Sequence, residues 1–399
     1  MDEIRFVKYE GKAAANTAAL VEALGVAAGA RVSRFHSSMP CYQETPLTAL
    51  PCLAEKLGLA GIYIKDESKR FGLNAFKALG ASYAMTEALS TRVGEQSLSF
   101  QELKSPKVQE KLKDLTFITV TDGNHGRGVA WMARQLGCKA IVMMPAGTVQ
   151  ERVDNIAKEG AEVTISPWNY DETVRHVRKL AQENGYLLMQ DTAWEGYEDI
   201  PLHIMQGYTS MAREAFAQLA ETNKFPTHVF LQAGVGSMAG AVTGYIADYC
   251  RSCHKQLPKI VIVEPTLADC CYRTAAANDG NLHFVTGAMN SMMAGLCCGE
   301  PCTLGWSLLQ AYASGFMAIA DPVAAEGMRQ LARPLGKDAP IVSGESGAAG
   351  FSALLAIMTR NDMLEIKQAL ELDETSTVLC FSTEGDTDKE NYRKIVALD

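Results

Sequence analysis

One lysine of the chain stands where its amine could act as a nucleophile. Lys77 follows Phe76 and precedes the run Ala78–Leu89, in which apolar residues recur every three or four positions, as on one face of a helix. An amine at the start of such a helix is partly withdrawn from water, which lowers its pKa and makes it a usable nucleophile. Taken alone, a lysine whose stem packs along the helix while its amine stays in water is the alternative.

A polar turn forms the second motif. The residues Thr121-Asp122-Gly123-Asn124-His125-Gly126 follow a strand-like run and open a helical one. Such a turn presents backbone N–H groups and the Asn124 amide at the carboxyl end of a parallel strand, where α/β proteins bind ligands. A capped turn between strand and helix, without a ligand, is the alternative.

A glycine-rich turn forms the third motif, Gly234-Val235-Gly236-Ser237-Met238, with Gly240 two residues further on. Its glycines let backbone amides close on a phosphate, with the positive end of a helix behind it. The same glycines, followed by a helix and a strand ending in Glu264, also imitate a dinucleotide-binding fingerprint. The turn alone therefore does not separate a nucleotide from a smaller phosphate ligand.

Three further patterns in the chain are weaker signals of function. Ser382 opens the polar segment STEGDTD, which could face a ligand or form a simple turn. Cys250-Arg251-Ser252-Cys253-His254 spells a haem-attachment pattern, which we interpret as the end of a helix. The pairs Cys270-Cys271 and Cys297-Cys298 lack zinc-ligand spacing, so we expect thiols and no metal site, and a disulfide between the pairs stays open.

Two series of strand-like runs must position these motifs. The first comprises residues 61–67, 116–121, 139–145, 162–166 and 186–190, and the second comprises residues 227–232, 259–264 and 377–381. Several runs are nearly all apolar, as is typical of parallel strands covered on both faces. Helical patterns lie between them, and two end at glycines suited to a left-handed turn, Gly137 and Gly160.

This alternation predicts an α/β fold of two lobes, each a mainly parallel sheet flanked by helices. We expect residues 1–75 and 204–399 to form a larger domain with the phosphate-binding turn. Residues 76–203 form a smaller domain that carries Lys77 and the Asn124 turn. The charged stretch 91–113 is interpreted as a surface insertion.

Composition narrows the possible partners and the compartment. The 399 residues carry a net charge of −9, and this acidic balance argues against binding nucleic acid. Apolar stretches are too short to span a bilayer, and the first residues show no secretion signal, so no membrane partner is expected. Eleven scattered cysteines favour a cytoplasmic enzyme.

Taken in chain order, the motifs resemble those of the fold-type II pyridoxal-phosphate enzymes, the group of threonine dehydratase, cysteine synthase and the tryptophan synthase β chain. The match runs from Thr45-Pro46-Leu47 to Asp388. More closely, seven segments are similar to those of diaminopropionate ammonia-lyases: DESKRFGLNAFK, TDGNHGRGVAW, QERVD, QDTAWEGY, LQAGVGSMAG, SGESGA and STEGDTD.

The resemblance implies a role for each matched residue. Lys77 would bind pyridoxal 5'-phosphate covalently, Asn124 would hydrogen-bond its phenolic oxygen, and Ser382 would face its pyridine nitrogen. The turn Gly234, Val235, Gly236, Ser237 and Met238 would wrap the phosphate. A hydroxyl at the ring nitrogen makes a weaker electron sink than a carboxylate would, which favours prompt loss of a β-substituent. A small amino-acid substrate and a homodimer are also implied.

Two departures from the dehydratases bear on the substrate. They usually carry a small neutral residue in the position of Asp122, and a serine in that of Ala75. A carboxylate at Asp122 suits a substrate with a second ammonium group. We therefore expect Lys77 and Asp122 as catalytic residues, and Asp122, Gly123, His125 and Asp191 in the substrate site, with Asp191 as a helix cap the alternative.

The reaction expected from the resemblance is α,β-elimination of 2,3-diaminopropionate to pyruvate and two ammonia. A serine/threonine dehydratase and a β-replacement synthase on the same cofactor site are the nearest alternatives. An NAD-dependent dehydrogenase would leave the Lys77 and Asn124 motifs unexplained, and a non-catalytic metabolite-binding protein would need no buried lysine.

Overall fold

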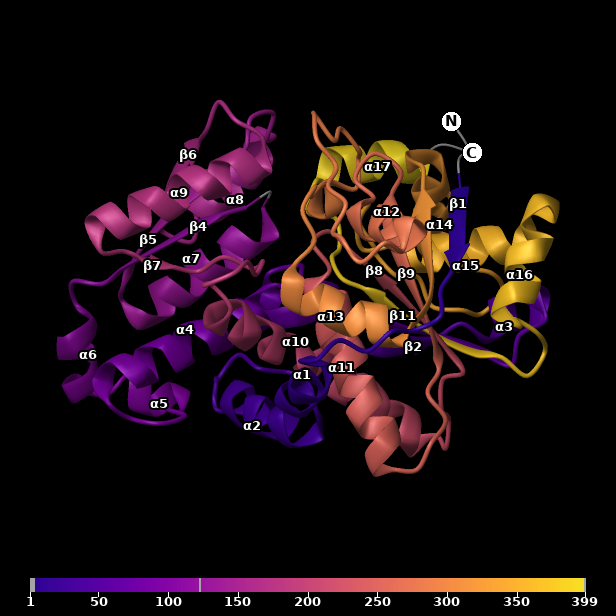
Figure 1. Ribbon diagram of the computed structural model, residues 1–399, viewed down its shortest axis with the longest axis horizontal. Helices are drawn as coiled ribbons and strands as arrows, with labels where there is room; N and C mark the ends of the chain where they lie inside the picture. Colours follow the sequence, from indigo (N-terminus) through magenta and orange to yellow (C-terminus); the bar gives the residue numbers. More distant parts are fainter. Residues whose placement is uncertain (1–3, 122, 398–399) are drawn as a thin grey trace.

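The computed structural model describes residues 4–121 and 123–397, and it is built on two sheets with helices on their faces (Figure 1). The larger sheet has seven strands in the order β1-β10-β9-β8-β11-β3-β2. Their bounds are β1 (Ile4–Lys8), β2 (Leu47–Ala49), β3 (Gly61–Asp66), β8 (His228–Gln232), β9 (Lys259–Pro265), β10 (Ala313–Ile319) and β11 (Thr377–Ser382). Only the two edge strands of this sheet, β1 and β2, pair antiparallel; the inner strands are parallel.

The smaller sheet, on the left of Figure 1, is wholly parallel, with the order β6-β5-β4-β7. Its strands are β4 (Thr116–Val120), β5 (Lys139–Met144), β6 (Glu162–Ile165) and β7 (Leu187–Leu188). The predicted α/β class with two mainly parallel sheets is confirmed, and every predicted strand is present. Strands β1, β2 and β10 are additions that the sequence patterns did not indicate.

Helices of the larger sheet divide between its two faces because successive strand residues point to opposite sides. Val229 and Leu231 join the core with α1 (Thr17–Leu24), α10 (Asp199–Glu221), α11 (Ser237–Ser252) and α13 (Thr303–Tyr312). Phe230, between them, joins the opposite core with α3 (Pro51–Leu57), α14 (Asp321–Ala332), α15 (Ala349–Thr359), α16 (Leu364–Leu370) and α17 (Lys389–Ala397). The sheet is therefore buried on both faces, as its apolar strands predict.

The smaller sheet packs in the same way. Phe117 on β4 contacts the core of α4 (Ala78–Val93), α5 (Phe100–Leu103), α6 (Pro106–Leu112) and α7 (Asn124–Leu136). Ile118, the next residue, packs on α9 (Tyr170–Asn184), and α8 (Gln150–Ala157) packs against the middle of α7 through Ile156 and Ala130. The predicted surface insertion forms α5 and α6, whose apolar side chains are buried in this core while most of their charged residues are exposed.

The remaining elements are α2 (Val26–Ser37), α12 (Cys270–Ala277) and three short 3-10 helices, η1 (Glu67–Gly72), η2 (Ala294–Leu296) and η3 (Asn361–Met363). Gly137 is the left-handed C-cap of α7, with φ of 72°, as predicted. Helix α8 ends earlier than predicted, at Ala157, and Gly160 follows three residues later with φ of 90°. The haem-like pattern lies at the end of α11, with Cys253 as its C-cap. None of the described helices combines the length and the apolar character that a membrane crossing needs.

Helices α4 and α10 cross in close contact, which joins the two sheets. A Cβ atom added at Gly207 would lie 2.3 Å from the carbonyl oxygen of Leu79, and one at Gly80 would lie 2.5 Å from the Tyr208 ring. Only glycine permits this approach of two backbones. Because α10 runs without a break from Asp199 to Glu221, the domain boundary expected at residues 203 and 204 falls inside a helix.

Candidate active site

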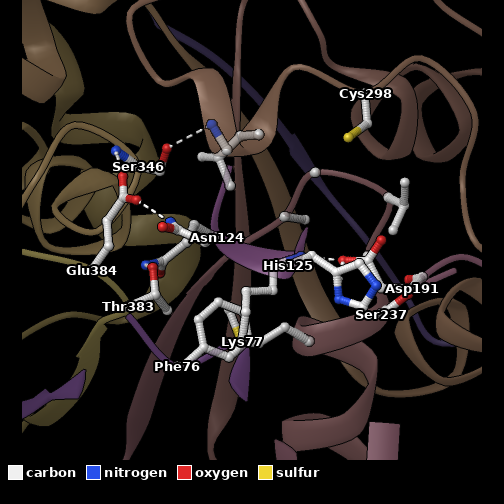
Figure 2. Close-up of a pocket in the computed structure, with 18 of the residues that line it drawn as sticks. Phe76, Lys77, Asn124, His125, Asp191, Ser237, Cys298, Ser346, Thr383 and Glu384 are labelled. Carbon is white, nitrogen blue, oxygen red and sulfur yellow. Dashed lines mark hydrogen bonds and ion pairs between the residues drawn. The ribbon is translucent and has the colours of Figure 1, made fainter. Parts of the chain in front are cut away.

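A cavity lies at the carboxyl ends of β4, β8 and β11, where the predicted motifs meet (Figure 2). It is lined by Lys77, Asn124, His125, Asp191 and the whole turn from Gly234 to Met238. These are nine of the residues that the sequence analysis singled out. Because these motifs meet at one cavity, the alternative that each is an unrelated turn is excluded.

Lys77 is the N-cap residue of α4, and residues 73–76 connect it to η1. Gly128 on α7 fixes this position, because a Cβ atom there would lie 3.0 Å from the backbone N and Cα of Ala78. The Lys77 side chain is 19% exposed, so it is largely withdrawn from water as the sequence predicts. Its amine forms an ion pair with the carboxylate of Asp191.

Asp191 follows β7 and is held at the centre of a polar network. Its Oδ1 accepts a hydrogen bond from the Tyr170 hydroxyl (3.3 Å). Burial by itself raises the pKa of Asp191, but the charges of His125 and Lys77 at low pH and the hydrogen bonds from Lys77 and Tyr170 bring the pKa down to about 2. Asp191 is therefore a carboxylate at neutral pH and serves as the counterion of the lysine.

His125 lies beside the same carboxylate, with its Nδ1 3.7 Å from Asp191 Oδ2. Its Nε2 lies 2.6 Å from the Met189 carbonyl oxygen, which can only accept, so Nε2 carries the hydrogen. Burial lowers the pKa of His125, and the imidazole is neutral at pH 7. Nδ1 is then an unprotonated, buried nitrogen with no hydrogen-bond partner in the described part of the chain.

The glycine-rich turn connects β8 to α11 and forms a cradle for an anion. Gly236 is the N-cap of α11 with φ of 91°, a left-handed conformation that favours glycine. At Gly234 a Cβ atom would lie 3.3 Å from Cys298 Sγ and from the backbone of residues 295–296. The first N–H groups of a helix have no partner within it, so this turn presents donors and the positive helix end to the cavity. Ser237 is fixed by donating to the Asp191 carbonyl oxygen (2.7 Å).

Asn124 opens α7 on the other side of Lys77, and its amide donates to Glu384 Oε2. Glu384 Oε1 accepts from the Ser346 backbone N–H (3.2 Å), and its Oε2 also accepts from the Thr387 hydroxyl (3.3 Å). Figure 2 shows Asn124, Glu384 and Ser346 on one side of Lys77, and His125 and Asp191 on the other.

Three predicted residues are not among the described residues that line the cavity. Asp122 lies outside the described residues. Gly123, the N-cap of α7, and Ser382 do not form part of the lining. The Ser382 hydroxyl donates instead to Ser343 Oγ (2.8 Å), because neighbouring residues at the end of a strand point to opposite sides. Its contact with a ring nitrogen stays a prediction.

Sequence reasoning missed several residues of the wall. They are Phe76, Thr121, Tyr170, Gln232, Ala233, residues 295, 296 and 298, Ser346, Thr383 and Glu384. Thr383 and Glu384 lie inside the STEGDTD segment, and Ser346 lies inside SGESGA, so membership in those segments was an available signal. Tyr170, Gly295 and Leu296 carried no local signal, and Cys298 drew notice only as a thiol of the Cys297-Cys298 pair.

The dinucleotide alternative fails on Glu264, which would have to reach a ribose. This residue is fully buried, and it accepts backbone hydrogen bonds from Cys271 (2.9 Å) and Tyr272 (2.6 Å) at the start of α12. Burial raises the pKa of Glu264 to about 8. The carboxyl thus holds a helix end. The eleven cysteines are free thiols, so the disulfide left open by the sequence is not formed.

The donor set fits pyridoxal 5'-phosphate. The cavity offers a half-enclosed amine for an aldehyde, a cradle of backbone N–H groups that a side chain at Gly234 would fill, and an amide for a phenolic oxygen. Lys77, Gly234–Met238 and Asn124 are the residues that would hold these three parts.

Comparison with known proteins agrees with this chemistry. Residues 39–384 match the family model described as "Pyridoxal-phosphate dependent enzyme". The diaminopropionate ammonia-lyase of Salmonella typhimurium is 49% identical over 384 residues, which cover 95% of this chain and 94% of that one.

Among solved structures, that of the selenomethionine-incorporated holo diaminopropionate ammonia-lyase of Escherichia coli is similar with a TM-score of 0.90 and 44% identity, over 98% of this chain and 96% of that chain. A biosynthetic L-threonine dehydratase of Haemophilus influenzae is 30% identical over only 60% of this chain and 39% of its own length. The chain therefore belongs to the pyridoxal-phosphate-dependent enzymes and, within them, to the diaminopropionate ammonia-lyase family.

Proposed function

We propose that this protein catalyses the α,β-elimination of 2,3-diaminopropionate with pyridoxal 5'-phosphate, so that substrate and water give pyruvate and two ammonia. The observation that carries the proposal is the Lys77 amine, which lies inside the cavity beside Asp191, within a lining that also contains the Gly234–Met238 cradle. Family membership supplies the substrate, because the similar enzymes are diaminopropionate ammonia-lyases along nearly their whole length.

Bound pyridoxal phosphate would make the Cα–H of an amino acid acidic enough to be removed. The chain's own residues bind and orient it. The turn from Gly234 to Met238 would hold the phosphate, Asn124 the phenolic oxygen, and Ser382 the ring nitrogen as a neutral hydroxyl. Asp191 keeps the Lys77 amine in place, since the two groups form an ion pair.

Proton transfer is assigned to two residues. The Lys77 amine takes the Cα proton of the L-isomer, and Asp122 is the candidate base for the D-isomer. The β-amine leaves protonated, as ammonia, because an amide anion is too basic to depart. We place Asp122, Gly123, His125 and Asp191 around the substrate, with the Asp122 carboxylate suited to its second ammonium group.

The experiment is pyruvate release from a panel of diaminopropionate, serine and threonine by purified protein. We expect a yellow protein whose absorbance band shifts when diaminopropionate is added, and turnover of this substrate well above that of the hydroxy amino acids. A clear preference for serine or threonine would favour the dehydratase alternative. Colourless protein that binds NAD would overturn the proposal.

The domain division, the oligomeric state and the compartment are also proposals. We propose that residues 76–203 act as a small domain against residues 1–75 and 204–399, and that the enzyme is a homodimer, as its fold-type II relatives imply. Eleven free thiols support a reducing compartment, so we place the protein in the cytoplasm. Light scattering of the purified protein tests the dimer, and we expect no nucleic-acid or membrane partner.

A further inference from the structure

A second, outer cavity adjoins the first one. Tyr170 lines both cavities, and two chain segments separate them, because Cys297 and Glu345 line the outer cavity while Cys298 and Ser346 line the inner one. The outer wall also contains Arg152, Asp388 and Asn391. Glu345 therefore lies in the wall between the outer cavity and the inner one that Lys77 lines.

Glu345 is a buried carboxyl with an unused acceptor. The residue is 1% exposed, and its Oε1 accepts from the Asn391 side chain (2.6 Å). Its Oε2 is covered and has no hydrogen-bond partner among the residues that the structure describes. A buried polar atom without a partner destabilises a fold, so its presence calls for a functional reason.

The backbone around Glu345 holds it in place. A Cβ atom at Gly344 would lie 2.3 Å from the Gly385 carbonyl oxygen, and one at Gly347 would lie 2.5 Å from that of Glu384. The segment is therefore pressed against the strand end that carries Glu384.

The charges around Glu345 come from three elements. Glu384 follows β11, Arg152 lies on α8, and Asp388 precedes α17. Burial and the nearby Glu384 raise the pKa of Glu345 to about 7, against the opposing effects of its own backbone N–H, Asn391 and Arg152. A cation at the Glu345 carboxyl would favour its ionised form and supply the missing donor.

We propose that Glu345 is a specificity-determining residue that binds the side-chain ammonium of a diamino acid in the outer cavity, on its way to the inner cavity that Lys77 lines. The inference rests on the proposed function and deepens it. An ionised carboxylate accepts a charge-assisted hydrogen bond from an ammonium, which is stronger than its bond from the hydroxyl of serine. Glu345 thereby selects a diamino acid over a hydroxy amino acid.

The test compares Glu345→Gln with Glu172→Gln in the holoenzyme. Glu172 lines the same outer cavity but is exposed, so its variant removes an equal charge from the rim. We expect E345Q to raise KM for diaminopropionate about tenfold, with kcat and the KM for serine nearly unchanged. E172Q should leave all three values nearly unchanged.

The pH dependence separates substrate binding from a structural role. Below pH 7 the wild-type carboxyl is protonated and resembles glutamine, so the ratio of KM values, E345Q over wild type, should approach one. Above pH 7 the ratio should reach the expected value of about ten. Protonation of the substrate changes both KM values equally, so it does not affect the ratio. Gln keeps the oxygen that accepts from Asn391, so we expect E345Q to fold, with a melting temperature at pH 8 no lower than that of wild type.

Three outcomes would overturn the inference: an unchanged KM in E345Q, an equal rise for serine, or a ratio independent of pH. If E345Q does not fold, Glu345→Asp keeps the charge and must retain the preference for diaminopropionate over serine. Wild-type protein that releases no pyruvate from diaminopropionate would instead overturn the proposed function, and this inference with it.

Discussion

The amine of Lys77 and the carboxylate of Asp191, 114 positions apart in the chain, form an ion pair inside the cavity. Lys77 begins α4, while Asp191 follows the last strand of the smaller sheet. The pair gives the nucleophile a fixed position and a counterion within a largely buried site.

Replacing Lys77 by alanine should abolish turnover, because we propose that this amine both binds the cofactor and takes the Cα proton. We expect a loss of at least about 10³-fold in kcat and the disappearance of the lysine-linked absorbance band. Mass spectrometry after borohydride reduction should find the cofactor on residue 77 of wild type. Lys69→Ala, at an exposed position of the same segment, is the control and should behave as wild type. Retained turnover in K77A would refute the assignment.

Replacing Asp191 by asparagine should lower kcat/KM for diaminopropionate about 10²-fold, because the Lys77 amine loses its counterion. The pKa of Asp191 is about 2, so the carboxylate is ionised throughout the working range, and the loss should be uniform from pH 6 to pH 9. Asp338→Asn removes another buried carboxyl, one that accepts from the backbone of Cys52 and Leu53 at 2.9 Å. That variant should lose stability and keep its rate per folded molecule.

Replacing Gly236 by alanine should weaken cofactor binding about tenfold. Its φ of 91° costs a residue with a Cβ atom about 1–2 kcal/mol, and the added atom would lie 3.3 Å from Leu309 at the base of the cradle. Titration of the apoenzyme with pyridoxal phosphate measures the change. Gly280→Ala imposes a similar strain, at φ of 86° and with open space around it, and should leave cofactor affinity unaltered.

Replacing Glu214 by glutamine should destabilise the fold by about 3 kcal/mol. Glu214 bridges two buried cations, Arg70 at 2.8 Å and Lys65 at 2.7 Å. Burial raises the pKa of Glu214, but these cations lower it to about 2. Its contribution is therefore complete above the unfolded pKa near 4.5 and is lost as pH falls toward 2.

Denaturant unfolding of wild type and E214Q from pH 7 to pH 3 measures this contribution. The difference in the free energy of unfolding should shrink as the pH falls. Glu390→Gln, in an exposed pair with Lys394 at 2.6 Å, is the control and should leave the free energy of unfolding nearly unchanged at every pH. A difference that stays constant with pH would contradict the assignment to Glu214.

The strands that the sequence patterns predict differ in burial and composition from β1, β2 and β10, which the patterns do not predict. The runs 228–232 and 259–265 are almost wholly buried on both faces, so the central residues of each run are apolar. Strand β2 has only three residues, β1 is a half-exposed edge, and β10 contains Ser314 and Gly315. Their pairing depends on neighbouring strands, and a local pattern does not record it.

Within the cavity, the sequence by itself determined the chemical groups and the turns that present them. Lys77, Asn124 and Gly236 each stand at the start of a helix, where residues a few positions away set the backbone. Only the tertiary structure decided their partners. Asp191 meets Lys77, and Glu384 meets Asn124 across 260 positions, because two sheets pack with the carboxyl ends of their strands toward one cavity. The spacing of residues along the chain determines local geometry. Contacts between residues more than a hundred positions apart are determined only by the packing of sheets and helices in layers.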